Sequence, residues 1–530
     1  MIGFTLFALF VVLMLAGVPI GAALGLGGIV AIAWANADTQ WWGLLAAPQN
    51  LQAGIAKYPL LALPMFVLVG SVFDRAGVAQ RMVDFAVACV GRSPGMLPLV
   101  AITVAMVLGG ISGSGPANAA AVGGVMIAAM SRAGYPPAFS ASVVGAAAAT
   151  DILIPPSIAF IVYSVNVPGA SVPALFAAGM VPGVLAGLAL VLPAVWVSRR
   201  HGFGQAEAAL PRPPFWRSLR EASWGLAAPV LILGGMRVGW FTPTEAAAVA
   251  AAYGLLVGMF VHRTIGFGDL YEIFRDATET SAVIMIVLAL AGIFAYSVST
   301  LGIADPVVAW VTALGLGSTG TLILLFVVMT VLGMFLDGVS IFLVFLPLLY
   351  PLMQHFRWDP VWFGVLLTMK IAIGQFTPPM AVNLMVACRL ARVRMEQTVP
   401  WVGWLLVAGA VFGLFFHALG IALGEPMFVT EIRPETNTVV LGREDALIRN
   451  GMMVGKANLM KYGTLPEAGL ETVTKVRYRD GGTLSTIRPL GNDVEVSFHA
   501  NVKGVAPGQS AVFYEGDDVV GGGIIQGSFN

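Results

Sequence analysis

Two distant stretches of this 530-residue chain interrupt apolar sequence with the same spacing of helix-breaking residues. Pro155–Pro156 follows Gly110 after 45 residues, and Pro378–Pro379 follows Gly333 after 45 residues, so the stretches align at an offset of 223. Only seven of the 48 aligned positions are identical. The repeat is therefore defined by the matching positions of glycine and proline, the residues that interrupt helices. Paired interruptions in two halves of an apolar chain are typical of secondary transporters, whose sites lie near the bilayer midplane. The offset pairs two further breakers: Gly115 with Gly338, and Pro137 with Pro360.

Composition predicts a polytopic α-helical membrane protein, because 58% of the residues are hydrophobic and only 11% are charged. The first apolar run is too long for a signal peptide and follows no basic residue, so we expect a retained helix. Several expected spans are interrupted by the breaks described above. We expect spans at roughly 4–33, 59–74, 97–131, 138–165, 172–198, 223–240, 244–262, 280–300, 305–350, 361–390 and 399–423.

The charge density divides the chain near Pro426. Residues 1–426 hold 18 basic and 16 acidic residues, whereas the last 104 residues hold 10 and 12. We therefore expect a membrane domain over 1–425 and a soluble domain over 427–530. The membrane domain contains repeats at about 59–198 and 280–424, and the basic loop 199–221 joins them on the cytoplasmic side. That loop carries Arg199, Arg200, Arg212, Arg217 and Arg220.

Catalytic and metal-binding motifs are missing from the sequence of the first 426 residues. Cys89 and Cys388 have no metal-ligand spacing, and no nucleotide-binding loop is present. The run beginning at Gly110 is not a nucleophile elbow, because no strand precedes it. We expect no enzyme activity and no cofactor, only coupling ions.

The breaks hold the polar residues that could bind ions or substrate. Proline pairs remove backbone donors and leave carbonyl oxygens without helical partners, and such oxygens suit hard cations. Ionisable residues at membrane depth are functional candidates. A simpler interpretation remains for each feature: small residues for helix packing, prolines for kinks, and an ion pair between Lys370 and Asp337. The candidates are Ser112, Ser114 and Asn118 in the first glycine break, Asp151 before the first proline pair, Asp337 in the second glycine break, and Lys370, Gly374, Thr377 and Asn383 around the second pair.

Six motifs in order make residues 1–425 resemble the large membrane subunit of TRAP transporters. They include GISGSGPANAAAVGG, ILIPPSIAF, FTPTEAAAVAAAYGL and MKIAIGQFTPPMAVNL. The resemblance implies an elevator-type symporter with two re-entrant hairpins and two broken helices, held in the bacterial inner membrane. It implies two partners, a small four-helix membrane subunit and a periplasmic solute-binding protein that delivers a small organic acid such as a dicarboxylate.

Sodium sites follow from the same resemblance, position by position. The first site would use Ser112, Ser114, Asn118 and the segment from Thr150 through Asp151 to Ile154. The second would use Gly333, Asp337, Gly374 and Thr377. For the substrate we assign Ser112, Ser157, Lys370 and Asn383. Two positions depart from the family pattern, which commonly has an acid at 118 and an asparagine at 370; a fixed ammonium at 370 could replace a bound cation.

Residues 427–530 resemble the C-terminal β-barrel of tRNA-specific thiouridylases, through FVTEIRPETNTVVLGREDALIRNGMMVGKANLM and APGQSAVFYEGDDVVGGGII. The thiouridylase chemistry needs a nucleotide-binding domain and cysteines, and this tail has no cysteine. Its net charge of −2 predicts at most weak, salt-sensitive RNA contact. Alternating strands are expected at Thr438–Leu441, Thr472–Tyr478, Glu495–His499 and Ser510–Tyr514.

The leading hypothesis is therefore an ion-coupled transport subunit with a small all-β barrel at its C-terminus, on the cytoplasmic side. One alternative is an accessory protein of tRNA modification that the first 426 residues anchor to the lipid bilayer. Another is a fusion artefact near 425–428 whose tail has no function.

Overall fold

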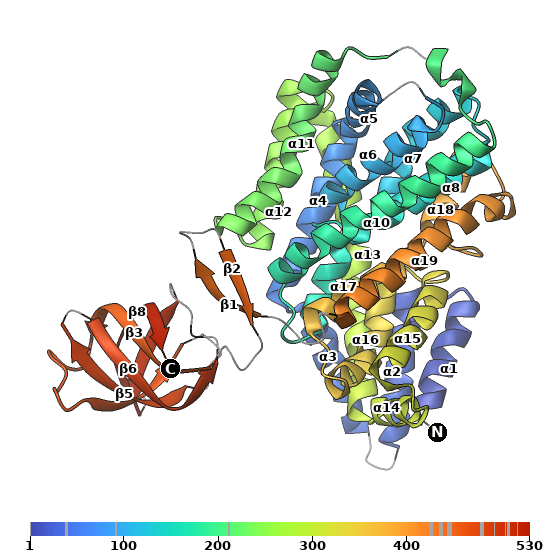
Figure 1. The fold of residues 1–530 in the computed structure, drawn as a ribbon. Helices are drawn as coiled ribbons and strands as arrows, with labels where there is room; N and C mark the ends of the chain where they lie inside the picture. The colour runs from blue at the N-terminus through green and yellow to red at the C-terminus, as the bar shows by residue number, and fades with distance from the viewer. Residues whose placement is uncertain are drawn as a thin grey trace. The chain divides into compact units, whose positions relative to one another are not determined.

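A computed structural model describes the chain over 2–37, 41–90, 93–209, 212–422, 428–433, 438–442, 448–476, 482–491, 493–503, 505, 509–516 and 518–529. It divides into two compact units, Met1–Leu419 and Gly420–Asn530. The first is helical and the second is mainly β-sheet (Figure 1). The predicted boundary at Pro426 lies outside the described residues.

The helical unit is a polytopic membrane protein. By length and apolar composition, six of its described helices can cross a bilayer, or up to seven if the bent pair α14–α15 counts as one span. The helices are α1 (Ile2–Leu15), α2 (Ile20–Ala35), α3 (Ala46–Ile55), α4 (Ala62–Arg75), α5 (Val78–Cys89), α6 (Met96–Ser112), α7 (Gly115–Arg132), α8 (Pro137–Ala148), α9 (Ile158–Asn166), α10 (Val172–Arg200), α11 (Phe215–Val238), α12 (Pro243–Leu256), α13 (Phe267–Thr300), α14 (Ala304–Ala313), α15 (Gly317–Gly333), α16 (Gly338–His355), α17 (Pro360–Gly374), α18 (Val382–Ala391) and α19 (Val399–Ala422).

The expected single span at 4–33 is wrong, because this segment forms two helices, α1 and α2. Gly17 adopts a left-handed backbone with φ of +86°, and Pro19 precedes the first turn of α2. Proline lacks the N–H that a continuous helix would need, so the chain turns between the two helices.

The predicted helix breaks are confirmed. Helix α7 starts after the N-cap residue Ser114, and α16 starts after the N-cap residue Asp337, its counterpart at the offset of 223. Helices α8 and α17 both begin at the paired prolines, Pro137 and Pro360. Proline at the first position of a helix sacrifices no hydrogen bond, which explains why these starts coincide.

The turns of the first half gather at one end of the helical unit, which we call the arginine end because Arg199 and Arg200 finish α10 there (Figure 1). The Arg199 side chain donates to the Pro94 carbonyl, just before α6. In the turn between α7 and α8, the Tyr135 hydroxyl donates to Glu207, which lies beyond α10. Helices α6 and α7 therefore form a hairpin that enters from the arginine end.

The second hairpin, α15 and α16, enters from the opposite end. The indole N–H of Trp358, which follows α16, donates a 2.8 Å hydrogen bond to the Ser318 hydroxyl at the start of α15. The Tyr163 hydroxyl near the end of α9 donates to the Pro360 carbonyl at 2.7 Å. Because α8 starts at the arginine end and α9 continues away from it, these contacts mark the far side of the unit. The two hairpins thus point toward each other from opposite ends.

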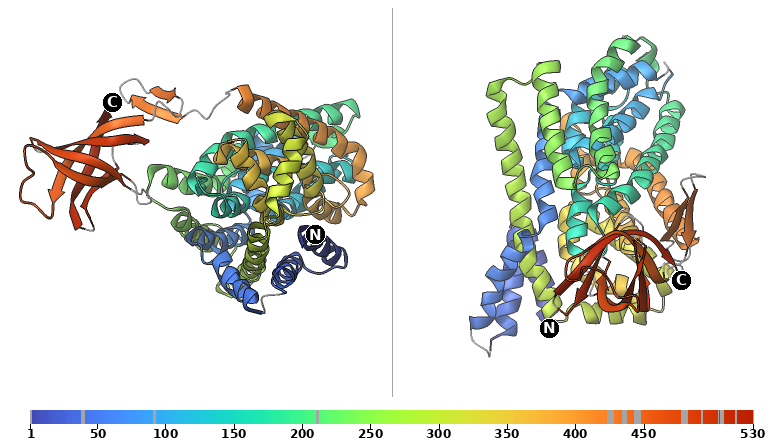
Figure 2. Two further views of the ribbon diagram at one scale, coloured as in Figure 1. Left: turned by 90° about the horizontal axis from the view of Figure 1, so that it is seen from below. Right: turned by 90° about the vertical axis from the view of Figure 1, so that its left-hand side faces the viewer.

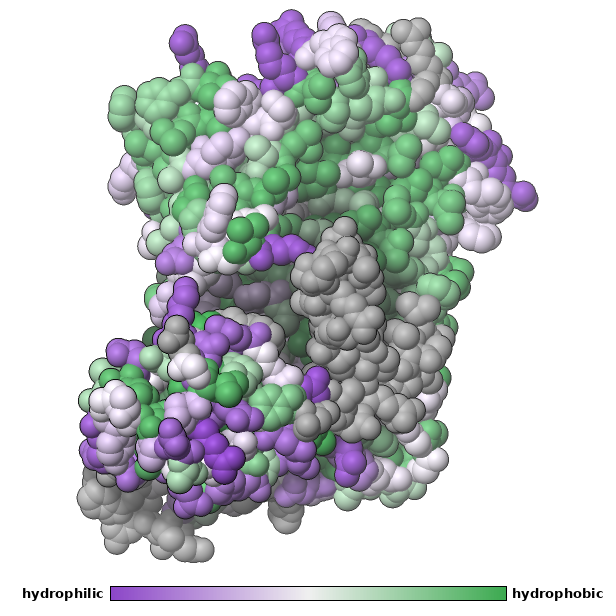
Figure 3. Space-filling model, turned by 60° about the vertical axis from the view of Figure 1, so that its left-hand side comes forward, coloured by the Kyte–Doolittle hydropathy of each residue, from purple (hydrophilic) through white to green (hydrophobic). Residues whose placement is uncertain are grey.

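Helix α13 supports both halves, and it can be followed along the unit in Figure 2. It has 34 residues, so it spans about 51 Å at 1.5 Å per residue. It packs against α2, α3 and α4 and against α16 of the second hairpin. On the face shown in Figure 3, hydrophobic residues cover a broad area of the helical unit and hydrophilic residues gather at its upper edge, as expected for a protein surrounded by lipid.

The second unit contains a closed six-stranded barrel with the order β3-β6-β5-β4-β7-β8, and a separate two-stranded sheet, β1-β2. Alternating residues of the barrel strands fill its core, among them Val494 and Val496 of β6 and Ala511 and Phe513 of β7. All four expected strands lie in or overlap observed ones, although residues 477 and 478 lie outside the described residues. The strands are β1 (Phe428–Arg433), β2 (Thr438–Gly442), β3 (Ile448–Leu459), β4 (Leu470–Lys475), β5 (Thr483–Leu490), β6 (Asp493–Lys503), β7 (Ser510–Glu515) and β8 (Asp518–Phe529).

Candidate functional site

The tip of the first hairpin packs directly on the first proline pair. Gly113, between α6 and α7, has a φ of +61°, and a Cβ there would lie 2.6 Å from the Pro156 carbonyl oxygen. Only glycine fits this left-handed, crowded position without strain. The break in the α8–α9 segment and the hairpin tip are therefore one structural site.

Asp151 is the central side chain of this first site. It is fully buried in the short helix before the proline pair, and its Oδ2 accepts a hydrogen bond of 3.3 Å from the Ser112 hydroxyl. Its Oδ1 has no hydrogen-bond partner among the described residues. Gly109 makes room for it, since a Cβ at that position would lie 2.7 Å from Oδ1. A buried carboxylate with one free oxygen requires a cation or a proton.

Two buried amide oxygens border the same hairpin. Asn118, in the first turn of α7, donates to the Ala105 carbonyl at 2.8 Å and leaves its Oδ1 without a described partner. Asn383, at the start of α18, is also buried and leaves its Oδ1 unpaired. It belongs to the second half, but a Cβ on Gly115 would lie 2.7 Å from its amide. Asn118, Asp151 and Asn383 thus each bury one unpaired oxygen in or against the first hairpin.

Asp337, at the tip of the second hairpin, has its oxygens occupied. As the N-cap of α16 it accepts from the backbone N–H groups of Val339 and Ser340, at 3.0 and 3.3 Å, and from the Ser340 hydroxyl. Capping of this kind satisfies backbone donors that a helix start would otherwise leave free. This carboxylate is therefore less available to a cation than that of Asp151.

The other residues assigned to the second site form a tight helix crossing. Gly333 and Gly374 face each other on α15 and α17, where a Cβ on Gly374 would lie 2.5 Å from the Gly333 Cα. The Thr377 hydroxyl donates to the Ile373 carbonyl at 2.6 Å. Thr330 lies next to this crossing, since a Cβ on Gly374 would lie 2.6 Å from its carbonyl oxygen. Its buried hydroxyl has no hydrogen-bond partner among the described residues. Together with the Asn383 Oδ1, it is one of two unpaired side-chain oxygens that the described residues of this half bury.

Side-chain and backbone donors occupy carbonyl oxygens that the first proline pair was expected to leave open. The Ser157 hydroxyl donates to the Ile152 carbonyl at 2.6 Å and also accepts from Phe160 as the N-cap of α9. The Thr150 carbonyl accepts from Leu153 and from Ile154, at 3.0 and 3.2 Å. These backbone carbonyls are therefore occupied, and the unpaired oxygens described above belong to side chains.

Lys370 is buried, with 1% of its surface exposed, but it does not pair with Asp337 as the simpler interpretation expected. Its Nζ lies 4.0 Å from the centroid of the Phe326 ring on α15, and no ion pair is made to it among the described residues. Lys370 precedes Gly374 by one helical turn, so it faces α15 as Gly374 does. The negative face of the ring takes the place of an anion.

A cavity of about 370 Å³ opens beside the first hairpin tip. Ser112, Ser114 and Asn118 line it, together with Ser71 and Asp74 of α4. No described lining residue is basic. The start of α7 borders it, and the positive end of a helix dipole favours an anion there. The cavity is suited to a small polar ligand.

Sequence reasoning missed several of these residues. Asp74 and Thr280 line the cavity from helices outside the two hairpins, and nothing in their local sequence marks them. Gln375 is buried and accepts from the Asn383 amide at 3.2 Å, which orients that side chain. Its position between Gly374 and Thr377, just before a proline pair, was a usable signal.

Comparison with known families matches the two units separately. Residues 7–418 match the family described as "Tripartite ATP-independent periplasmic transporter, DctM component". Residues 449–525 match the family described as "Aminomethyltransferase beta-barrel domain". The second match agrees with the resemblance of the tail to a barrel of tRNA-modifying enzymes.

Relatives of known name extend over most of the helical unit. The C4-dicarboxylate TRAP transporter large permease protein DctM of Pseudomonas aeruginosa is 38% identical over 394 residues, 72% of this chain and 91% of that protein. The isethionate TRAP transporter permease protein DctMQ of Oleidesulfovibrio alaskensis is 35% identical over 397 residues. That alignment covers 74% of this chain but 61% of the isethionate protein.

Solved structures of similar fold are transporters. The YdaH transporter of Alcanivorax borkumensis superimposes with a TM-score of 0.52 at 14% identity, covering 77% of this chain and 98% of its own. MtrF of Neisseria gonorrhoeae superimposes with a TM-score of 0.54 at 10% identity, covering 75% of this chain and 95% of its own. At such identities the likeness concerns the fold alone.

Proposed function

The chain belongs to the DctM family of tripartite ATP-independent periplasmic transporters, and on that premise we propose that it imports a small organic acid together with cations, sodium first among them. The movement would follow an elevator mechanism in which the hairpins carry the site across the membrane. The cation gradient would supply the driving force, about 2.3 kcal/mol per elementary charge and 100 mV of potential.

The charge around the first hairpin tip is the observation that carries this proposal. The cavity is bordered by the carboxylate of Asp74 and by no described basic side chain, and the buried Asp151 lies behind Ser112. An organic acid entering alone would meet the negative charge of these carboxylates, which the partial positive charge at the start of α7 offsets only in part. A cation bound first would neutralise that charge, so anion binding would depend on cation binding. Such dependence is what a symporter requires.

The residues present fit a sodium ion. Sodium is a hard cation that prefers oxygen ligands, and the unpaired oxygens of Asn118, Asp151 and Asn383 are buried at this tip. Among the described residues no group of three or more His, Cys, Asp or Glu could hold a metal ion, so the site is unlike those of transition metals. We assign the stronger cation site to Asp151 and the weaker one to the Gly333–Gly374 crossing with Thr330 and Thr377.

The named relatives support the substrate class. The proteins described above are named for C4-dicarboxylates and for isethionate, which are small organic anions. We propose the same class for this chain, held in the cavity at the first tip by the N-terminus of α7 and by Ser112 and Ser114. Ser157, Lys370 and Asn383 do not line that cavity, so we assign them to positioning the breaks rather than to direct contact.

Uptake into proteoliposomes tests the coupling. The full chain, reconstituted with its partners, should accumulate labelled succinate or isethionate under an inward sodium gradient and much less under potassium alone. A proton gradient run in parallel separates sodium binding at Asp151 from protonation of the same carboxylate. Accumulation that ignores both gradients would refute the proposal.

The family implies partners and an orientation that we also propose. The arginine end would face the cytoplasm of a bacterium under the positive-inside rule, which places the chain in the inner membrane. A small four-helix membrane subunit would complete the assembly, and a periplasmic binding protein would deliver the acid to the opposite end. Labelling of single cysteines introduced at the two ends, in intact cells, tests the orientation.

We propose that the barrel takes no part in transport. The alternatives of tRNA modification and of a fusion artefact concern this unit, whose family includes parts of enzymes. Its own core and closed sheet indicate independent folding. A chain ending at Glu425, which lies outside the described residues, should transport at the full rate.

The cytoplasmic location expected for the barrel does not agree with the proposed orientation of the helical unit. The Trp401 ring at the start of α19 packs on His201 and Phe203 at the arginine end, and α19 then spans the membrane away from that end. We therefore propose that the barrel follows α19 on the periplasmic side, and labelling of a cysteine introduced into the barrel in intact cells tests this.

A further inference from the structure

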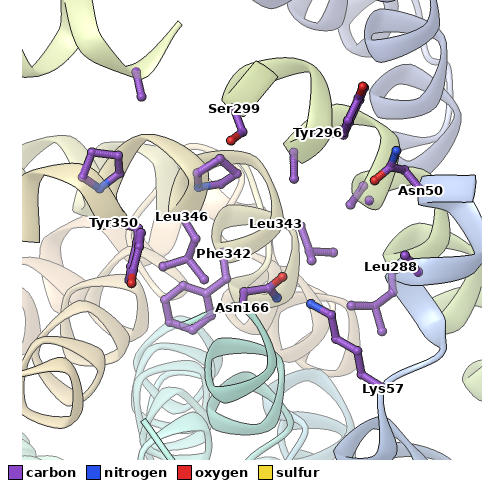
Figure 4. Close-up of a pocket in the computed structure, with 18 of the residues that line it drawn as sticks. Asn50, Lys57, Asn166, Leu288, Tyr296, Ser299, Phe342, Leu343, Leu346 and Tyr350 are labelled. Atoms are coloured by element: carbon purple, nitrogen blue, oxygen red, sulfur yellow. The ribbon is translucent and has the colours of Figure 1, made fainter. Parts of the chain in front are cut away.

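A second and larger cavity has a volume of about 480 Å³ (Figure 4). Lys57 of its lining donates to the Val165 carbonyl near the end of α9, so the cavity lies at the end of the helical unit opposite the arginine end. Helices α3, α13, α14 and α16 surround it, together with Lys57 and Asn166. None of the residues assigned to ion or substrate binding lines it. It is therefore a separate site, and we call it the vestibule.

One wall of the vestibule is a rigid helix pair. A Cβ on Gly292 of α13 would lie 2.5 Å from the Asn50 carbonyl oxygen of α3, and one on Gly54 would lie 2.9 Å from the Leu288 carbonyl oxygen. The two backbones are thus in direct contact. The facing wall is α16, an arm of the second hairpin, which contributes Phe342 among others. The vestibule therefore lies between a fixed support and an element of the second hairpin.

Lys57 supplies the positive charge of the vestibule. Its Nζ donates to the Val165 carbonyl at 3.0 Å, which uses one of three N–H groups. No carboxylate lies within ion-pair distance of it among the described residues. Figure 4 shows the ammonium of Lys57 directed toward the Asn166 side chain, inside the space that Leu343 and Phe342 border. Lys57 and the buried Lys370 are the two lysines of residues 1–426.

Neutral hydroxyls line other parts of the vestibule, and Figure 4 shows those of Ser299, Tyr296 and Tyr350 across the space from the Lys57 ammonium. The Tyr350 hydroxyl accepts from Gln354 at 3.0 Å, so its own hydrogen is free to be donated into the vestibule. Ser299 and Tyr296 add hydroxyls, and Leu288 adds apolar surface for a short carbon chain. Asp305 also lines the space and opposes a second acidic group near it. One ammonium, several hydroxyls and an apolar wall match a small molecule with an oxyanion at one end.

We propose that the vestibule is a binding station for a small organic oxyanion, a carboxylate or a sulfonate, which Lys57 holds before the anion reaches the hairpin tips. The idea that this anion is the transported substrate rests on the proposed function; binding itself does not. An oxyanion could also come from a lipid headgroup, since the vestibule opens at one end of a membrane protein. The organic acid is favoured because the lining hydroxyls and carboxamides suit a small polar molecule.

Protection of Lys57 from acetylation tests the proposal on the full chain in neutral detergent. An amine-reactive ester is added with succinate, with isethionate, or with sodium chloride of equal ionic strength, and each lysine is followed by peptide mass spectrometry. Either acid should slow modification of Lys57 about five- to tenfold, the factor expected for one charge-assisted contact. Lys461 and Lys475 of the barrel are internal controls whose rates should not change.

Other outcomes would overturn the proposal. Equal modification with and without both acids, or equal protection by chloride, means that no anion site exists. Protection by phosphatidylglycerol alone means that the vestibule binds lipid. Tyr350→Phe should weaken protection by the acid, because it removes one hydroxyl and keeps the ring; unchanged protection would argue against binding in this space.

Transport assays distinguish a failure of the vestibule proposal from a failure of the proposed transport function. Lys57→Gln should raise the KM for uptake about five- to tenfold at unchanged kcat, and Lys57→Arg should restore the KM. Asp151→Asn should weaken the sodium dependence of uptake and leave the protection of Lys57 intact, since Asp151 does not line the vestibule. If sodium-driven uptake fails but protection persists, only the proposed function is wrong. If uptake is normal but Lys57 is never protected, only the vestibule is wrong.

Discussion

Gly333 of α15 and Gly374 of α17 meet so closely that a methyl group on Gly374 would lie 2.5 Å from the Gly333 Cα and 2.6 Å from the Thr330 carbonyl oxygen. Both near atoms belong to the backbone, so neither can move away without displacing a helix. The second proline-pair break is thus fixed against the second hairpin by the absence of two side chains.

Gly374→Ala should destabilise the helical unit by about 1–3 kcal/mol, the usual cost of overpacking. The matched control is Gly124→Ala on α7, where an added Cβ meets nothing within 4 Å. Helix propensity should make that control neutral or slightly stabilising. Thermal unfolding in detergent measures both variants, and equal melting temperatures would contradict the close crossing.

Asp151→Asn should raise the sodium concentration for half-maximal uptake about tenfold or more, which corresponds to about 1.4 kcal/mol or more of lost cation binding. Ser112→Ala should cause a smaller increase, because it removes a hydroxyl that orients Asp151 through a 3.3 Å bond. Ser142→Ala on α8 is the control: its buried hydroxyl donates to the Ala138 carbonyl at 2.7 Å and to the Thr398 carbonyl at 3.4 Å, and neither residue is assigned to the site. A sodium titration that moves equally in all three variants would indicate a packing effect.

Lys370→Met should raise the melting temperature and leave the sodium titration unchanged. The ammonium is buried and makes no described ion pair, so an apolar side chain of similar length removes a charge that the Phe326 ring offsets only in part. The hypothesis that this ammonium replaces a bound cation predicts instead that Lys370→Asn increases sodium dependence. Sodium-dependent uptake by the two variants decides between these expectations.

Tyr135→Phe should destabilise the arginine end by about 1–3 kcal/mol, because it removes a donor to the buried Glu207 and the acceptor of the Gly95 N–H at 2.8 Å. Burial and the hydrogen bond to Glu207 raise the pKa of Tyr135, so its hydroxyl stays a donor throughout the physiological range. Tyr253→Phe, which loses one exposed bond to the Trp224 carbonyl, should cost less. Hydrogen exchange at residues 93–97 reports the difference, and unaltered exchange would refute it.

The barrel should become less stable in acid through Lys461, which bonds Asp518 at 2.8 Å and Glu515 at 3.0 Å. The hydrogen bond from Lys461 lowers the pKa of Asp518, and bonds from Tyr462 and then Lys461 lower that of Glu515. Their stabilisation is therefore complete above the unfolded values, about 4, and is lost as the pH falls through the lower folded values.

Calorimetry of the full chain should show the barrel transition falling between about pH 5 and pH 3. Lys461→Met should make that fall shallower, whereas Lys475→Met should not, because Lys475 lies over the Tyr514 ring and makes no described ion pair. Identical acid profiles for wild type and Lys461→Met would exclude this cluster as the cause.

Local rules explain what the sequence could predict. Glycine and proline act on the backbone where they stand, so the starts of α7, α8, α16 and α17 could be read from the paired breaks. The same rule applies at Gly17 and Pro19, but the long apolar run around them led to the expectation of a single span. Alternation in the tail likewise predicted strands that the barrel contains.

Contacts between distant segments could not be predicted in this way. Asp337 is a helix cap because of where three donors lie around it, and Lys370 faces a ring because of how α17 is rotated against α15. Asn383 of the second half reaches Gly115 of the first only through the packing of the whole unit. A polar residue at a helix break could therefore be recognised from the sequence as a functional candidate, but its role depended on tertiary structure.

The aligned halves differ where their chemistry matters: at the offset of 223, Asp151 corresponds to Gly374 and Ser114 to Asp337. Two interchangeable halves that exchanged conformations would give an outward-open and an inward-open state of equal free energy. In the proposed transport cycle, the exchange would move a buried carboxylate with one unpaired oxygen on one side and a glycine contact on the other, so the two states would differ in free energy. The resting population would then be biased toward one orientation before any gradient is applied, and the first cation bound would reset that bias.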